Sequence, residues 1–154
     1  MTTRGIQFLK SKKIQHTVVK YDHAAKGAEF AAQAVGFPLA QTVKTLVVAL
    51  DDNSSALVLM PGDRQLSMKK IAAACGTKRA AMADTATAQR LTGYLVGGIS
   101  PFGTQKRLPV VMEACLQGFA EVMINAGRRG IMVKMAPTDI IAVLDAKIVD
   151  LVQE

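Results

Sequence analysis

The sequence has no tryptophan, two histidines and only two cysteines, Cys75 and Cys115, in 154 residues. The cysteines stand too far apart for a Cys-x-x-Cys motif, which argues against a disulfide scaffold and favours a reducing compartment such as the cytoplasm. So few sulfur and imidazole ligands make a poor structural zinc site, and we expect no metal and no other cofactor. No apolar run approaches the ~18 residues of a membrane span, and charged residues interrupt the N-terminus where a secretory signal would be apolar.

Acidic residues are also few. Twelve Asp and Glu stand against 19 Lys and Arg, which gives a formal net charge of +7. A basic surface favours a polyanionic partner such as a nucleic acid.

Aromatic residues make up 5% of the chain, too few for a platform on which single-stranded bases stack. Basic pairs beside expected loops either follow a phosphate backbone or are merely solvated; they are Lys69–Lys70, Lys78–Arg79, Lys106–Arg107 and Arg128–Arg129.

The length suits a single domain that covers residues 1–154, since domains cluster at roughly 100–150 residues. Hydrophobic periodicity and turn residues predict about seven strands and four or five helices, with strands often adjacent in sequence. This pattern indicates an α+β fold with a mixed, barrel-like sheet and surrounding helices. We expect helices over 3–13, 28–35, 68–75, 85–91 and 138–144, strands over 16–20, 43–50, 56–60, 94–96, 109–115, 121–126 and 131–136, and a last strand or tail over 147–152.

Lys44 is the single residue whose position is least expected for its type. It stands in segment 43–50, where both alternating sets of side chains are mostly apolar, as in a strand buried on both faces. Its stem could cover apolar surface while the ammonium reaches water, or the ammonium could sit at the mouth of a pocket. A neutral lysine at pH 7 needs a pKa lowered by roughly 3 units. We therefore interpret Lys44 as a charged binder of phosphate or of a developing oxyanion.

A glycine-rich loop over 97–103 is a second candidate. Gly98 and Gly103 have the glycine spacing of a Walker A motif, but Thr104 and Gln105 replace its Lys and Ser/Thr, so the loop is not a P-loop. Segment 97–101 is either a plain tight turn or a set of free N–H groups that could form an oxyanion hole.

The chain offers no strong nucleophile. Ser100 lies in no Gly-x-Ser-x-Gly motif, and both cysteines are expected in structural positions within a helix or a strand. Any hydrolysis would therefore use water, or a group of the substrate, positioned by Lys44 and the backbone.

Three stretches together carry a resemblance: 41–46 around Lys44, 82–109 with the glycine loop, and the hairpin tip 127–130 with sequence Gly-Arg-Arg-Gly. They resemble the YbaK-type aminoacyl-tRNA deacylases, and also the editing domain inserted in bacterial prolyl-tRNA synthetases, over essentially the whole chain. That family removes a wrongly attached amino acid from tRNA in trans, most typically cysteine from proline tRNA, and related members prefer alanine.

The resemblance implies a role for each matched residue. Lys44 would be the essential lysine, and the Gly-x-x-x-Pro loop would be Gly97, Gly98, Ile99, Ser100 and Pro101. The substrate would contact Tyr21, His23, Phe30, Thr45 and Asn125, and the tRNA would contact Lys106, Arg107, Arg128 and Arg129. In cysteine-specific members the thiol of the substrate would attack its own ester carbonyl, which suits a chain without a nucleophile.

Three departures from the family bear on the amino acid more than on the reaction. Residues 21–25 read Tyr-Asp-His-Ala-Ala, with Ala24 in place of an acid, where many relatives have Tyr-Glu-His-Asp-Pro. Asn125 stands where relatives often have Ser, and Met132 where they often have an acid. We expect a cytoplasmic enzyme that acts on the acceptor end of proline tRNA and releases cysteine, with prolyl-tRNA synthetase as a second candidate partner. Release of alanine, a non-catalytic tRNA-binding or regulatory module, and a small-molecule hydrolase are the alternatives.

Overall fold

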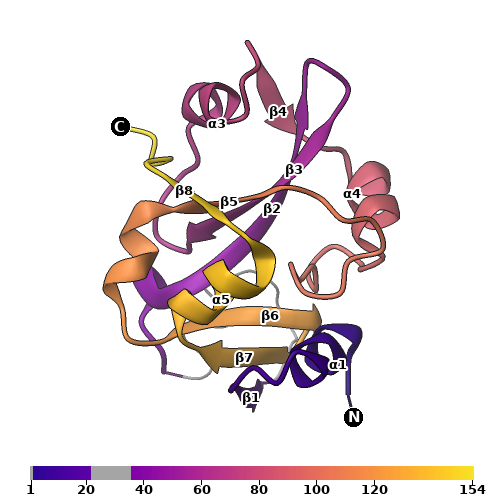
Figure 1. The fold of residues 1–154 in the computed structure, drawn as a ribbon, viewed down its shortest axis with the longest axis vertical. Helices are drawn as coiled ribbons and strands as arrows, with labels where there is room; N and C mark the ends of the chain where they lie inside the picture. The colour runs from indigo at the N-terminus through magenta and orange to yellow at the C-terminus, as the bar shows by residue number, and fades with distance from the viewer. Residues whose placement is uncertain (1, 22–35) are drawn as a thin grey trace.

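The computed structural model describes residues 2–21 and 36–154, which fold around one eight-stranded sheet (Figure 1). Along the sheet the strands run β1-β7-β6-β2-β3-β5-β8, and β4 pairs separately with β2. The strands are β1 (Thr17–Lys20), β2 (Thr42–Leu50), β3 (Ser55–Pro61), β4 (Ala80–Met82), β5 (Val110–Glu113), β6 (Val122–Arg128), β7 (Ile131–Met135) and β8 (Lys147–Val149).

Helices pack around this sheet (Figure 1). The α-helices among the described residues are α1 (Arg4–Ser11), α3 (Met68–Ala74), α4 (Thr85–Thr92) and α5 (Pro137–Leu144), and the 3-10 helices are η1 (Leu39–Gln41) and η2 (Ala114–Gly118). In the part of the chain that is described, no helix is both long and apolar enough to cross a bilayer.

The predicted α+β class with a mixed, barrel-like sheet is confirmed. β2 pairs in parallel with β6, β3 with β5 and β5 with β8, while the remaining pairs are antiparallel. The sheet is not closed, and it coils strongly around the long strand β2 (Figure 1). The expected helix over 28–35 lies outside the described residues.

Strand β2 is buried on both faces, as its sequence predicts. Val43 and Val47 belong to one apolar cluster, together with residues of α1, α4 and α5. Val48 and Leu50 belong to a second cluster, which α3 covers. Because successive side chains of a strand point to opposite faces, β2 separates two cores and is held firmly along most of its length.

One edge of β2 is only partly paired, and this gap positions the site. β3 pairs with residues 43–49 on one edge. On the other edge β6 pairs only with Thr42 and Val43, and β4 only with residues 48–50. Among the described residues none forms a backbone pair with residues 44–46 on that side, so the sheet is split there.

The expected strand over 94–96 is wrong. This segment forms a turn between two glycines in the left-handed region, Gly93 with φ 78° at the end of α4 and Gly97 with φ 98°. The Gly98 N–H donates to the Leu95 carbonyl at 2.9 Å and closes the turn. The apolar run predicts a strand, but a three-residue segment between such glycines has no room to pair.

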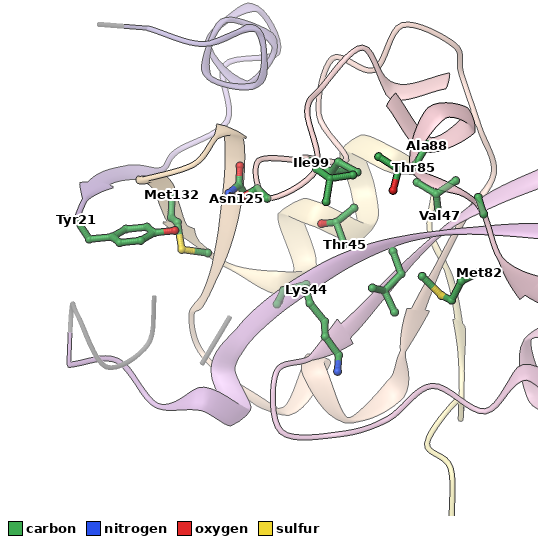
Figure 2. A pocket seen from close by; sticks show the side chains of 15 residues that line it. Tyr21, Lys44, Thr45, Val47, Met82, Thr85, Ala88, Ile99, Asn125 and Met132 are labelled. Carbon is green, nitrogen blue, oxygen red and sulfur yellow. Dashed lines mark hydrogen bonds between the residues drawn. The ribbon is translucent and has the colours of Figure 1, made fainter. Parts of the chain in front are cut away.

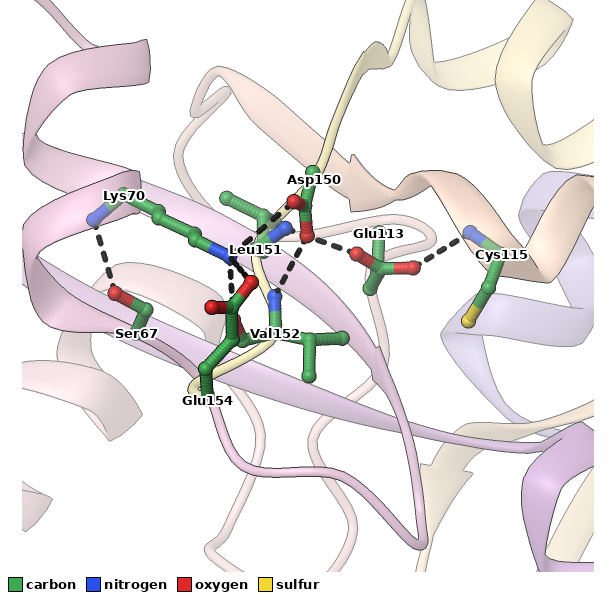
Figure 3. A network of polar contacts seen from close by, with 8 residues as sticks. All are labelled: Ser67, Lys70, Glu113, Cys115, Asp150, Leu151, Val152 and Glu154. Atoms are coloured by element: carbon green, nitrogen blue, oxygen red, sulfur yellow. Dashed lines mark hydrogen bonds and ion pairs between the residues drawn. The ribbon is translucent and has the colours of Figure 1, made fainter.

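Polar contacts around Glu113 hold the C-terminal segment in place (Figure 3). The Glu113 side chain is 2% exposed and accepts hydrogen bonds from the N–H groups of Cys115 and Leu151. Burial by itself raises the pKa of this carboxyl, but the hydrogen bonds from Cys115 and Leu151 outweigh it and the pKa lies below its usual range. Lys70 reaches the same segment through Asp150, at 3.2 Å.

Glu113→Gln is therefore expected to lower the free energy of unfolding at pH 7 by roughly 1–2 kcal/mol, because a charged acceptor of two buried N–H groups is lost. The pKa of Glu113 is depressed in the folded protein, so this stabilisation is present above about pH 4.3 and is lost as the pH falls through the folded pKa. Urea unfolding of the wild-type protein and of Glu113→Gln should show that the difference between their free energies of unfolding becomes smaller toward about pH 3. Glu121→Gln, at an exposed site, is the control, and an equal loss there would contradict the assignment.

Candidate active site

A cavity of about 330 Å³ opens at the unpaired stretch of β2 (Figure 2). Its walls come from β2, from the end of β1, from β4 and the start of α4, from the glycine loop, and from β6 and β7. Six of the expected site residues line it: Tyr21, Lys44, Thr45, Gly97, Ile99 and Asn125. None of the described lining residues is Ser, Cys, His, Asp or Glu, so this wall carries neither a usual nucleophile nor a carboxylate.

Lys44 lies at the edge of this cavity and is half-buried. Its side chain extends away from those of Thr45 and Ile99 (Figure 2), as the alternation along a strand requires. Burial lowers the pKa of the Lys44 ammonium, and the negative charge of Asp63 partly opposes this. The cation therefore lies beside the cavity, on the side of Asp63, rather than pointing at the glycine loop.

Thr45 points to the opposite side, into the cavity (Figure 2). Its hydroxyl oxygen is buried and has no hydrogen-bond partner among the described residues. The backbone of Thr45 also faces the gap. Thr42 and Leu50 use their backbone groups toward the β3 side, whereas the Val47 carbonyl accepts from Ala83 on the other edge. Since these directions alternate along a strand, the N–H and C=O of Thr45 point to the unpaired edge.

Asn125 ties the glycine loop to β6. Its side-chain oxygen accepts from the Gly127 N–H at 2.7 Å, and its amide nitrogen lies 3.5 Å from the Gly97 carbonyl. Tyr21 closes the far end of the cavity, where its N–H donates to the Gly130 carbonyl at 3.0 Å. The substitution at Asn125 relative to the family therefore supplies a polar side chain that holds the loop and also lines the cavity.

The glycine loop presents only part of itself to the cavity. Gly97 and Ile99 line it. Gly98 faces the hairpin tip instead, and its N–H donates to the Leu95 carbonyl. Ser100 is fully buried, and its hydroxyl accepts from the Phe102 N–H at 3.2 Å. Pro101 is buried too, and lines a separate cavity beside α1. These last three residues hold the loop from behind.

Gly98→Ala is expected to lower the melting temperature by about 5 °C, because overpacking costs roughly 1–3 kcal/mol. A Cβ at this position would lie 2.8 Å from the Arg129 backbone nitrogen and 2.9 Å from the Arg128 Cα, neither of which can move alone. Thermal unfolding followed by circular dichroism measures the effect. Gly118→Ala is the control, since nothing lies within 4 Å of its Cβ. Equal melting temperatures for both variants would show that the loop and the hairpin tip are not tightly packed.

Other expected residues lie outside the cavity. Arg128 and Arg129 stand at the tip of the β6–β7 hairpin, next to Gly98. Arg107 lines cavities on another part of the molecule, and Lys106 is exposed. His23 and Phe30 lie outside the described residues.

Sequence reasoning missed several lining residues, chiefly Met82, Thr85, Val96 and Met132. Met82 lies on β4, a strand too short to be recognised from its pattern, although its stretch is part of the family resemblance. Met132 is noted above only as a departure from the family, and here it packs in an apolar cluster with Val19 and Tyr21. An apolar thioether therefore stands at this point of the wall.

The fold is that of a trans-editing domain. A solved structure of a candidate trans-editing enzyme for prolyl-tRNA synthetase matches with a TM-score of 0.89 and 28% identity, covering 98% of this chain and 96% of that chain. Residues 22–143 match the family model of the aminoacyl-tRNA editing domain, and the chain belongs to this family.

Two relatives match over nearly the whole chain. EbsC of Enterococcus faecalis, named as a candidate Cys-tRNA(Pro)/Cys-tRNA(Cys) deacylase, is 26% identical over 97% of this chain and 92% of its own length. The multifunctional Ser/Thr-tRNA deacylase ProXp-y of Escherichia coli is 27% identical over 96% of this chain and 90% of its own length. A proline–tRNA ligase of Trichlorobacter lovleyi is 30% identical over 62% of this chain and 16% of its own length.

Proposed function

We propose that this chain hydrolyses the ester of mischarged tRNA in trans, and that its preferred substrate is cysteine on proline tRNA. The observation that carries the proposal is the small cavity at the gap in β2, faced by a strand backbone and by the Thr45 hydroxyl, which has no hydrogen-bond partner within the described part of the chain. The family supports the editing reaction. The name of EbsC, a relative over almost its full length, supports cysteine and proline tRNA.

The wall of the cavity favours a small, weakly polar amino acid. Val47, Met82, Ala88, Ile99 and Met132 give it an apolar lining. In this setting a charged side chain would lose hydration without a partner, which is costly. A thiol loses little on burial, because it behaves as a small apolar group.

The reaction follows from what the wall lacks. With no usual nucleophile among the described lining residues, the cysteine thiol, after losing its proton, attacks its own ester carbonyl carbon. A C–S bond forms, the C–O bond to the ribose breaks, and the ribose oxygen takes up a proton. Water then opens the cyclic thioester and yields free cysteine. We assign the stabilisation of the carbonyl oxygen, as it becomes negative, to the Thr45 N–H, which faces the edge of β2 that no described strand covers.

Lys44 has a separate task in this scheme. Its ammonium lies beside the cavity, so we assign it to a phosphate or to the ribose oxygen of the terminal nucleotide rather than to proton transfer. A lysine is a suitable point charge for such a group. The whole chain would act as one domain, working in the cytoplasm where charged tRNA is used.

A deacylation panel tests the proposal. Proline tRNA charged with Cys, Ala, Ser, Thr or Pro is incubated with the protein, with Cys on cysteine tRNA as the control for recognition of the tRNA. We expect cysteine to be released about tenfold faster than serine, since the two differ in the attacking atom and hardly in size. Faster release of serine or threonine, as the name of ProXp-y suggests for that relative, would replace the cysteine assignment. Binding of tRNA without any release would favour a non-catalytic module.

A further inference from the structure

A second cavity, of about 460 Å³, adjoins the first. It lies between segment 93–98, which precedes and includes the start of the glycine loop, and the hairpin tip 127–129. Val96 lines both cavities, and the consecutive residues Gly97 and Gly98 face the first and the second respectively. An extended ligand that leaves the first cavity at this point therefore enters the second cavity directly.

The charge of this second cavity is positive. Arg128 and Arg129 line it, and none of its described lining residues is acidic. Arg128 is exposed, while the Arg129 guanidinium lies close against Gly97, where an added Cβ would be 2.7 Å from Nη2. Arg129 thus lies against the glycine loop, at the junction of the two cavities.

Exposed apolar side chains complete this surface. Leu95 is 75% exposed and Val96 39%, and both line the second cavity. Of the four large apolar side chains that are exposed among the described residues, only Val18 is distant from both cavities, since Met82 lines the first. A patch of this kind beside two arginines suits a ligand that has a flat apolar face and a negative charge, which describes a nucleotide.

We propose that the second cavity binds the unpaired 3′-terminal nucleotides of tRNA while the ester occupies the first. This inference rests on the proposed function: with an aminoacyl ester in the first cavity, an RNA strand that leaves past Val96 and Gly97 enters the second cavity. Arg128 and Arg129 contact the phosphates between the last nucleotides. A terminal base lies on Leu95 and Val96.

Binding of uncharged RNA tests the subsite independently of catalysis. A fluorescent RNA minihelix that ends in the single-stranded CCA of tRNA is compared with the same minihelix without CCA, by anisotropy at several salt concentrations. We expect the wild-type protein to bind the CCA form about tenfold more tightly, because stacking and phosphate contacts are added. Leu95→Ser and Arg128→Gln should each remove about threefold or more of this advantage, and Arg128→Gln should reduce the salt slope by about one.

Matched controls are available on the same molecule. Arg79→Gln removes an exposed arginine, and Val18→Ser an exposed apolar side chain, both away from the two cavities. Both control variants should bind the CCA minihelix more tightly than the minihelix without CCA by the same factor as the wild-type protein. Equal wild-type affinity for the two minihelices, or an unchanged advantage in Leu95→Ser and Arg128→Gln, would overturn the subsite. CCA-dependent binding without release of any amino acid from charged tRNA would instead refute the proposed function and leave the subsite standing.

Discussion

Replacing Lys44 by methionine is expected to lower kcat/KM for deacylation of charged tRNA by about 100-fold or more. The variant keeps the length of the stem and removes only the charge that we assign to the terminal nucleotide. The ribose oxygen of that nucleotide is the leaving group of the ester, and one positioned donor at an atom where charge develops is worth about 10²–10³ in rate. The fold should persist, since the half-buried ammonium has no ion-pair partner within 4 Å among the described residues and its removal relieves a desolvation cost.

The measurement is release of amino acid under single-turnover conditions, with unfolding in urea as the check on folding. Lys69→Met, which removes an exposed lysine on α3, is the matched control and should retain the wild-type rate. Wild-type deacylation by Lys44→Met would remove Lys44 from the mechanism altogether. A loss of activity together with a loss of stability would assign the lysine to the fold.

The pH dependence of kcat/KM tests whether deacylation requires the charge of Lys44 and not only the size of its side chain. Burial lowers the pKa of Lys44, so its ammonium loses its proton at a lower pH than an exposed lysine does. If the cation is required, kcat/KM of the wild-type protein, corrected for spontaneous hydrolysis, should fall on the alkaline side below the usual lysine pKa of about 10.4. Lys44→Arg should lack this decline because a guanidinium stays charged.

Local signals in the sequence predicted most of the fold. The helices expected over 68–75 and 85–91 are present as α3 and α4. They begin after Ser67 and Asp84, residue types that favour helix N-termini, and in the structure these side chains accept from the N–H groups of Lys70 and Thr87. The burial of β2 on both faces follows from its apolar sequence. The strand β4 and the break between β4 and β6 were not predictable, because they depend on how distant segments meet at one edge of β2.

The same distinction applies to the site. A strand alternates its side chains, so adjacent Lys44 and Thr45 cannot point into one cavity from a fully paired sheet. Both border the cavity only because it opens at the strand edge, past the backbone between them. The resemblance named both residues, and both line the cavity, but it could not show that one supplies a cation beside the cavity and the other a hydroxyl within it.

Within the glycine loop, sequence alone could not separate the residues at the cavity wall from those behind it. The family pattern Gly-x-x-x-Pro specifies only Gly97 and Pro101 in segment 97–101, and it does not indicate which positions face the cavity. The separation comes from contacts distant in sequence, such as the Arg129 backbone against Gly98 and Gly5 beside the Ser100 hydroxyl. The loop is therefore one packed unit with the hairpin tip and α1, which keeps Gly97 and Ile99 in place at the wall.

Thr45→Val is expected to reduce kcat/KM by about 10–100-fold without lowering the free energy of unfolding. The Thr45 hydroxyl is buried without a partner among the described residues, a state that costs about 1–3 kcal/mol. Its replacement by a methyl group of similar size should leave stability unchanged or raise it. During deacylation the substrate supplies the missing partner, so the loss should be seen only in activity.

Thr92→Val supplies the opposite behaviour in the same protein. The Thr92 hydroxyl is equally buried, but it donates to the Ala88 carbonyl at 2.8 Å and accepts from the Tyr94 N–H at 3.2 Å. That variant should lose about 1 kcal/mol of unfolding free energy. Urea unfolding and deacylation of both variants then distinguish a hydroxyl that stabilises the fold from one that hydrogen-bonds to the substrate. A Thr45→Val protein that loses stability but keeps its activity would place the Thr45 hydroxyl in the first group.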